Sequence, residues 1–108
     1  MKKTISLLEK IMLTTIFPKQ GSRKELLVRE DIINKVKLTQ KDFSDFNIQE
    51  TEKGGLTWDE KGVVSKFDIE FTDLEIDEIK ASLKVLDEEK KLTREHNSLW
   101  EMFDVTIP

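Results

Sequence analysis

The 108-residue sequence has no cysteine and only one histidine, and these two absences exclude several kinds of site. Without cysteine there is no disulfide framework, no thiol nucleophile and no cysteine-ligated zinc. A single histidine, His96, cannot form a histidine-clustered metal site within one chain, and no serine-centred nucleophile motif accompanies it. Gly54-Gly55 lacks the spacing of a phosphate-binding loop. We therefore expect no enzymatic activity, no metal and no cofactor.

Long hydrophobic runs are also missing. The first residues, with Lys2 and Lys3 before several apolar side chains, imitate the start of a signal peptide, but Glu9-Lys10 interrupts the stretch and no small-residue cleavage site follows. An amphipathic helix explains this segment better. No apolar run approaches the roughly 18 residues that span a bilayer. We expect a protein without membrane contact in the cytoplasm, which also fits the absence of cysteine.

Hydrophobic residues make up 37% of the chain and charged residues another 37%. The apolar residues recur at helix and strand spacing, which indicates a folded protein rather than a disordered one. The length fits one domain, residues 1–108. We predict an α+β fold, mostly helical with about five helices, and a small antiparallel sheet of two or three strands in the middle of the chain.

Five segments have helical patterns, and four of them begin with a capping signal. The capping pairs are Ser6 with Glu9, Ser22 with Glu25, Thr39 with Asp42 and Thr72 with Glu75. The predicted helices run from about 4 to 15, 22 to 37, 40 to 46, 72 to 91 and 94 to 103, with Leu92-Thr93 capping the last.

Apolar spacing predicts which helix faces are buried. In the first helix the expected core positions are Leu8, Ile11, Met12 and Thr15, and Leu7 and Leu13 widen this face. The second helix should bury Leu26, Ile33 and Val36 with Val28 and Ile32, and the third Phe43 and Phe46. In the long fourth helix Ile76, Ile79, Leu83 and Leu86 form a heptad-like seam, with Leu74 and Ala81 beside it.

The middle of the chain has strand patterns. Residues 47–51 and 56–59 flank Gly54-Gly55 and predict a hairpin. Phe67, Ile69 and Phe71 alternate with charged residues, which is typical of a strand with one buried face. Residues 62–65 are ambiguous, and residues 104–108 either add an edge strand or fray.

Charge is distributed unevenly along the sequence. Residues 1–41 hold ten Lys and Arg against four acids, while the remaining residues hold eight against eighteen. The simpler interpretation is that the two parts pack together and neutralise each other. The alternative is that each forms a separate exposed face for a partner.

Three helices followed by a hairpin also fit a winged-helix regulator that binds nucleic acid. The segment that would read bases, 40–46, is acidic apart from Lys41, so phosphate contact there would be repelled. A nucleic-acid surface would have to lie in segment 22–41, with candidate contacts at Arg23, Lys24, Arg29, Lys35 and Lys37. This function remains an alternative, as does a homo-oligomeric structural protein associating through the Leu83 seam.

Trp58 and Trp100 are the candidate interface residues, because tryptophan often anchors protein interfaces where it is exposed. Packing in the core is the competing explanation for both.

With these elements in place, the sequence resembles a group of small uncharacterised proteins encoded by tailed phages and prophages. The resemblance rests on the turn Phe17-Pro18-Lys19-Gln20-Gly21, on Gly55-Leu56-Thr57-Trp58, and most specifically on residues 86–103. It brings no established activity, and it implies that His96 and Ser98 help to fix the last helix. We expect a non-enzymatic accessory protein that binds a host or phage protein.

Overall fold

The computed structural model describes residues 1–105, and within them it confirms the mostly helical α+β fold. The five predicted helices are α1 (Leu7–Leu13), α2 (Arg23–Val36), α3 (Gln40–Asp45), α5 (Asp73–Glu88) and α6 (His96–Met102). A sixth, the four-residue α4 (Glu60–Val63), forms in the stretch whose pattern was ambiguous. Asp59 caps it by accepting a hydrogen bond from the Gly62 amide.

The four predicted capping boxes are all present. Ser6, Ser22, Thr39 and Thr72 each accept a hydrogen bond from the amide three residues later, and the acid at that position returns a bond to the cap. Helix α6 differs, because it begins at His96 rather than Arg94 and the side chain of its N-cap, Glu95, makes no capping hydrogen bond. Instead the Thr93 amide donates to His96 Nδ1 at 2.8 Å, so His96 holds the turn that leads into α6.

Two small antiparallel sheets are present. The hairpin is confirmed as β2 (Gln49–Glu50) paired with β3 (Leu56–Thr57), and the alternating strand is β4 (Phe67–Glu70). Its partner is β1 (Lys2–Ile5), in the register Lys2↔Glu70 to Ile5↔Phe67. The predicted helix start near Thr4 is therefore wrong. Residues 2–5 form a strand because they pair with β4, and the local sequence of residues 2–5 does not reveal this pairing.

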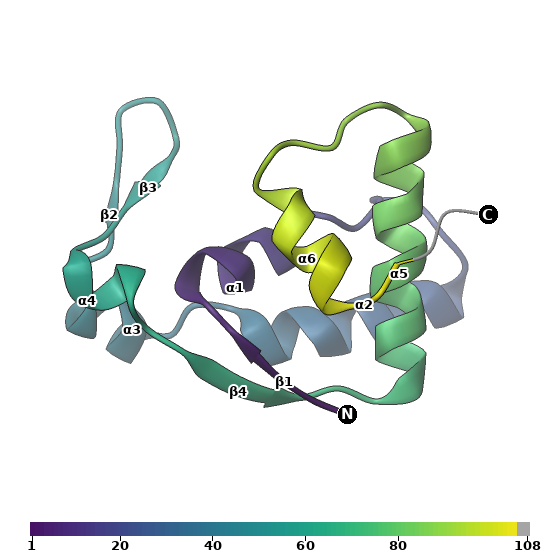
Figure 1. Ribbon diagram of the computed structural model, residues 1–108, viewed down its shortest axis with the longest axis horizontal. Helices are drawn as coiled ribbons and strands as arrows, with labels where there is room; N and C mark the ends of the chain where they lie inside the picture. Colours follow the sequence, from purple (N-terminus) through teal and green to yellow (C-terminus); the bar gives the residue numbers. More distant parts are fainter. Residues whose placement is uncertain (106–108) are drawn as a thin grey trace.

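The elements are arranged along a long axis (Figure 1). Helices α3 and α4 and the β2–β3 hairpin lie at one end, and α5 lies at the other with α2 packed against it. The core is formed between them, and its fully or almost fully buried side chains include Ile5, Leu13, Ile32, Phe71, Ile79, Leu83, Leu99 and Phe103. Phe71 and Phe103 meet edge to face, with ring centroids 5.7 Å apart.

Several side chains expected in the core lie at the surface instead. In α1 Leu7, Met12 and Leu13 are buried as expected, whereas Leu8 and Thr15 are exposed. In α2 the expected core residue Leu26 is exposed, because Arg29 turns inward and is satisfied there by acids and carbonyl groups. Phe43 is exposed as well, whereas Phe46 is half-buried and packs edge to face on Phe67.

The seam of α5 faces the interior. Ile76, Ile79 and Leu83 are buried, and Leu86 packs against the same core. An association between copies through Leu83 therefore has no exposed seam to use. The edge strand considered for 104–108 falls mostly on residues 106–108, outside the described part of the chain, although Val105 is buried.

Candidate binding surfaces

Apolar side chains from α1 and α4 surround Trp58 at the surface. Leu8, Trp58 and Val63 line one hollow of about 310 Å³, and we call these three residues the Trp58 patch. Leu8 is 40% exposed and Val63 is 66% exposed. Exposed apolar side chains that gather around a hollow, rather than lying singly, mark sites of interaction.

Gly62 fixes the position of Trp58 in this patch. A Cβ atom at Gly62 would lie 2.7 Å from Trp58 Cδ1 and 3.0 Å from Leu7 Cδ2, which is closer than atoms can pack. The indole therefore lies directly over the backbone of α4, and only glycine leaves space for it. The Trp58 patch depends on this close approach.

Trp100 has a different environment. It is half-buried and packs against the main core beside the fully buried Leu99. No described contact places it in the hollow with Trp58, so the two tryptophans do not form one surface.

Two of the five candidate nucleic-acid contacts, Arg29 and Lys35, are bound to other groups of the same chain. Arg29 is buried, its guanidinium binds Glu78 and Glu25, and it donates to the Pro18 and Gln20 carbonyl groups. Lys35 donates to Glu75 Oε1 at 2.6 Å and to the Glu70 carbonyl at 2.9 Å. Arg23, Lys24 and Lys37 are exposed, so the basic surface has three of its five expected members.

Ion pairs also settle how the two oppositely charged parts of the sequence meet. Four side-chain pairs join residues 1–41 to later residues: Lys2–Asp68, Lys10–Asp42, Arg29–Glu78 and Lys35–Glu75. Lys10–Asp42 and Arg29–Glu78 are buried. The expectation that the two parts neutralise each other is therefore confirmed for these residues.

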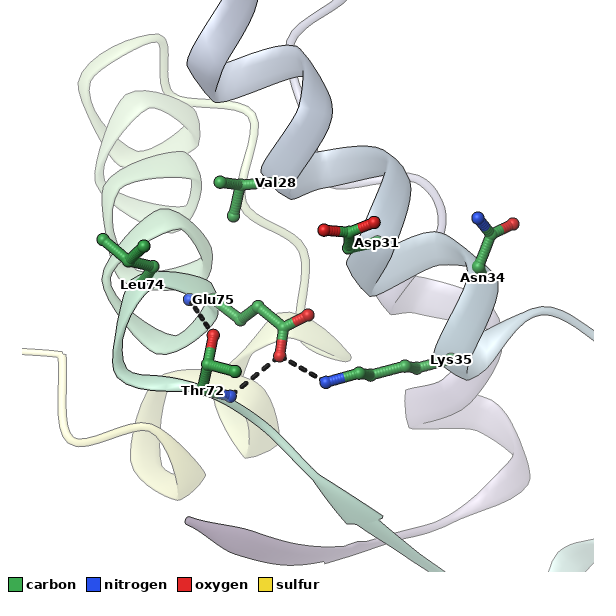
Figure 2. Close-up of a pocket in the computed structure, with 7 residues that line it drawn as sticks. All are labelled: Val28, Asp31, Asn34, Lys35, Thr72, Leu74 and Glu75. Atoms are coloured by element: carbon green, nitrogen blue, oxygen red, sulfur yellow. Dashed lines mark hydrogen bonds and ion pairs between the residues drawn. The ribbon is translucent and has the colours of Figure 1, made fainter.

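Between α2 and α5 lies a second hollow, of about 560 Å³ (Figure 2). Val28, Asp31, Asn34 and Lys35 reach it from α2, and Thr72, Leu74 and Glu75 from the start of α5. The Glu75 carboxylate accepts hydrogen bonds from Lys35 Nζ and from the Thr72 amide. The groups best suited to acid–base chemistry are thus bound to each other.

The electrostatics of this hollow keep Glu75 charged. Burial raises the pKa of the Glu75 carboxyl, but the hydrogen bonds from Lys35 and the Thr72 amide outweigh burial and hold the pKa below its ordinary value. A general base that works near neutral pH needs a pKa close to that pH, so this shift is in the wrong direction for one.

Residues 1–105 contain neither a metal-binding cluster nor a membrane-spanning helix. No three His, Asp or Glu side chains gather to hold a metal ion. No helix there combines the length and the apolar character needed to cross a membrane.

Trp58 was predicted from the sequence as an interface residue, whereas the exposure of Leu8, Val63 and Leu74 was not. Leu74 is 55% exposed although it was expected beside the buried seam. It precedes Ile76 by two positions, which is about 200° around a helix, so helical geometry could have assigned it to the opposite face. Val63 had no such signal, because its exposure depends on how α4 packs.

Comparison with family models, with curated proteins and with solved structures found no match to this chain.

Proposed function

We propose that this chain is a non-enzymatic accessory protein that binds another protein through the Trp58 patch. The observation that carries the proposal is the gathering of Leu8, Trp58 and Val63 around one hollow, with the indole packed directly against Gly62. A partner would insert an apolar side chain into this hollow and cover the exposed parts of Leu8 and Val63. Partly exposed tryptophans in such settings often dominate binding energy.

The partner is a protein of a phage or of its bacterial host. This part of the proposal rests on the resemblance of residues 86–103 to phage-encoded and prophage-encoded proteins. A cytoplasmic location follows from the same resemblance and from the absence of cysteine.

The two alternatives have less support. A nucleic-acid regulator using segment 22–41 would need free cations, yet Arg29 and Lys35 bind carboxylates and carbonyl groups of the same chain. In a winged-helix regulator the helix that contacts the bases would be α3, which is acidic apart from Lys41 and binds Lys10 through Asp42. A homo-oligomer built on the α5 seam would need Leu83 at the surface, and Leu83 is buried.

The test is affinity capture of the tagged protein from bacterial lysate with and without nuclease treatment, read by mass spectrometry, with matched variants. Val63→Ser removes an apolar side chain from the hollow. Val64→Ser is the matched control, because Val64 is a neighbouring valine of similar exposure that does not line it. Trp58→Ala completes the set.

We expect one stoichiometric partner with the wild type and with Val64→Ser. Trp58→Ala should weaken its affinity by about 2 kcal/mol or more, roughly thirtyfold, and Val63→Ser should reduce recovery as well. Equal recovery with both valine variants would contradict the proposed site. Recovery that disappears with nuclease would favour the nucleic-acid alternative.

A further inference from the structure

The hollow of Figure 2 is one half of a larger surface between α2 and α5. A smaller hollow of about 320 Å³ lies further along the same two helices. Val28 and Leu74 line both hollows, so they form the ridge between them. We call this ridge with its two hollows the saddle. It lies on the α2–α5 side of the molecule, away from α4 and the Trp58 patch (Figure 1).

The saddle is apolar along its ridge and open to solvent. Leu74 is more than half exposed, and the next turns of α5 add the small side chain of Ala81 to the second hollow. A helix or extended segment of a partner can place one apolar side chain in each hollow, on either side of the ridge. Amphipathic segments bind apolar grooves in the same way, through side chains on one face.

Charge selects the kind of partner. The two hollows are lined by two lysines and five carboxylates: Lys24, Lys35, Glu25, Asp31, Glu75, Asp77 and Glu78. Each hollow also has one carboxylate, Asp31 or Asp77, without an ion-pair partner among residues 1–105. The Ser22 amide that binds Glu25 lowers the pKa of that carboxyl, and the pKa of Glu75 is shifted in the same direction, so these two carboxylates stay ionised.

We propose that the saddle docks a basic amphipathic segment of a partner protein. Its apolar side chains occupy the two hollows on either side of Leu74, and its Lys or Arg side chains lie opposite Asp31 and Asp77. Charge complementarity at the rim of an apolar site accelerates and orients such binding. The same charges disfavour nucleic acid and a symmetric contact with the saddle of a second copy, because both would bring negative charge to a negative surface.

With the Trp58 patch at the other end, this surface gives the chain two separate docking sites. The saddle proposal does not depend on the Trp58 patch, since the two share no residue.

The test uses two fluorescein-labelled amphipathic peptides of about 18 residues, roughly five helical turns. Both have the same leucine stripe, and their polar positions are lysine in one and glutamate in the other. Binding to the full chain is measured by fluorescence anisotropy at near-physiological ionic strength, where screening limits unspecific attraction between distant charges. Amide shifts in ¹⁵N-labelled protein locate the bound peptide.

Two variants and two matched controls define the site. Leu74→Ala removes the ridge, and Leu26→Ala removes another exposed leucine that lines neither hollow. The double variant Asp31→Asn/Asp77→Asn removes the two unpaired charges, and Glu50→Gln/Glu52→Gln removes two exposed charges of the hairpin segment. Circular dichroism checks that each variant folds.

We expect the Leu/Lys peptide to bind, the Leu/Glu peptide not to bind, and amide shifts to cluster at residues 24–35 and 72–81. Leu74→Ala and the aspartate double variant should each weaken binding about tenfold, while both controls stay within about twofold. Equal binding of the two peptides, equal losses in the controls, or no binding of either peptide would overturn the proposal. A dimer in sedimentation that Leu74→Ala abolishes would assign the saddle to a second copy instead.

Discussion

Replacing Asp42 by Asn should destabilise the fold strongly, because it leaves a buried ammonium group without its counter-charge. The side chains of Lys10 and Asp42 are only 8% and 10% exposed, and Lys10 Nζ lies 3.0 Å from Asp42 Oδ2. Breaking a buried pair by removing one partner costs about 3–5 kcal/mol. The Phe67 ring, whose centroid lies 4.1 Å from the Lys10 ammonium, still stabilises the unpaired charge by about 1 kcal/mol. We expect a net loss of about 2–4 kcal/mol.

The double variant Lys10→Met/Asp42→Asn should recover most of this loss. It removes both charges, and methionine fills the space of the lysine stem against Phe67. Replacing a buried pair by neutral groups of similar volume is often neutral in free energy. The single variant Lys10→Met should also lose stability, so the coupling between the two sites should be at least about 2 kcal/mol.

Urea denaturation at pH 7, followed by circular dichroism, measures each free energy of unfolding. The exposed pair Lys91–Glu89 provides the control, and Glu89→Gln should change stability by less than about 0.5 kcal/mol. A cost below about 1 kcal/mol for Asp42→Asn would refute the reasoning. So would a double variant as unstable as the sum of the single ones, since the two charges would then act independently.

Three other predictions concern single groups. Stability should fall as pH drops below about 4.5, the ordinary pKa of glutamate. The folded protein holds the pKa values of Asp42 and Glu75 low, so these carboxylates are protonated at a higher pH in the unfolded chain than in the folded one. Glu75→Gln should make this fall less steep in acid titrations followed by circular dichroism. Gly62→Ala should displace the indole and change Trp58 fluorescence in a Trp100→Phe background, and an unchanged spectrum would contradict the close packing. Ser82→Ala should raise stability by about 1 kcal/mol in urea denaturation, because the buried Ser82 hydroxyl has no hydrogen-bond partner among residues 1–105; a loss would contradict this.

The sequence predicted helix starts well because capping is a local interaction. A serine or threonine and an acid three residues later are enough to satisfy the first amides of a helix, so Ser22 and Thr72 could be recognised without any tertiary information. Strand β1 could not be recognised in this way. Lys2–Ile5 is a short mixed segment, and only the free edge of β4 makes it a strand.

The binding surfaces were predicted less well, for a related reason. Trp58 could be selected by residue type, but its partners Leu8 and Val63 come from separate elements. Leu26 was expected in the core because the sequence cannot reveal that Arg29 would find acceptors in α5 and in the loop of Pro18 and Gln20. The exposure of Leu26 results from this tertiary choice, whereas that of Leu74 follows from helix geometry.

The pairing of β1 with β4 also determines the order in which this protein can fold. Thr4 donates a hydrogen bond to Asp68, 64 positions later in the chain, whereas every capping box closes over three. Contacts this distant in sequence form slowly, since a long loop must close first. At about 5–20 residues per second, a ribosome needs roughly 3–13 s to extend the chain from Thr4 to Asp68. We therefore expect helices α1 and α2 to form early in synthesis, and β1 to remain without a partner until β4 emerges.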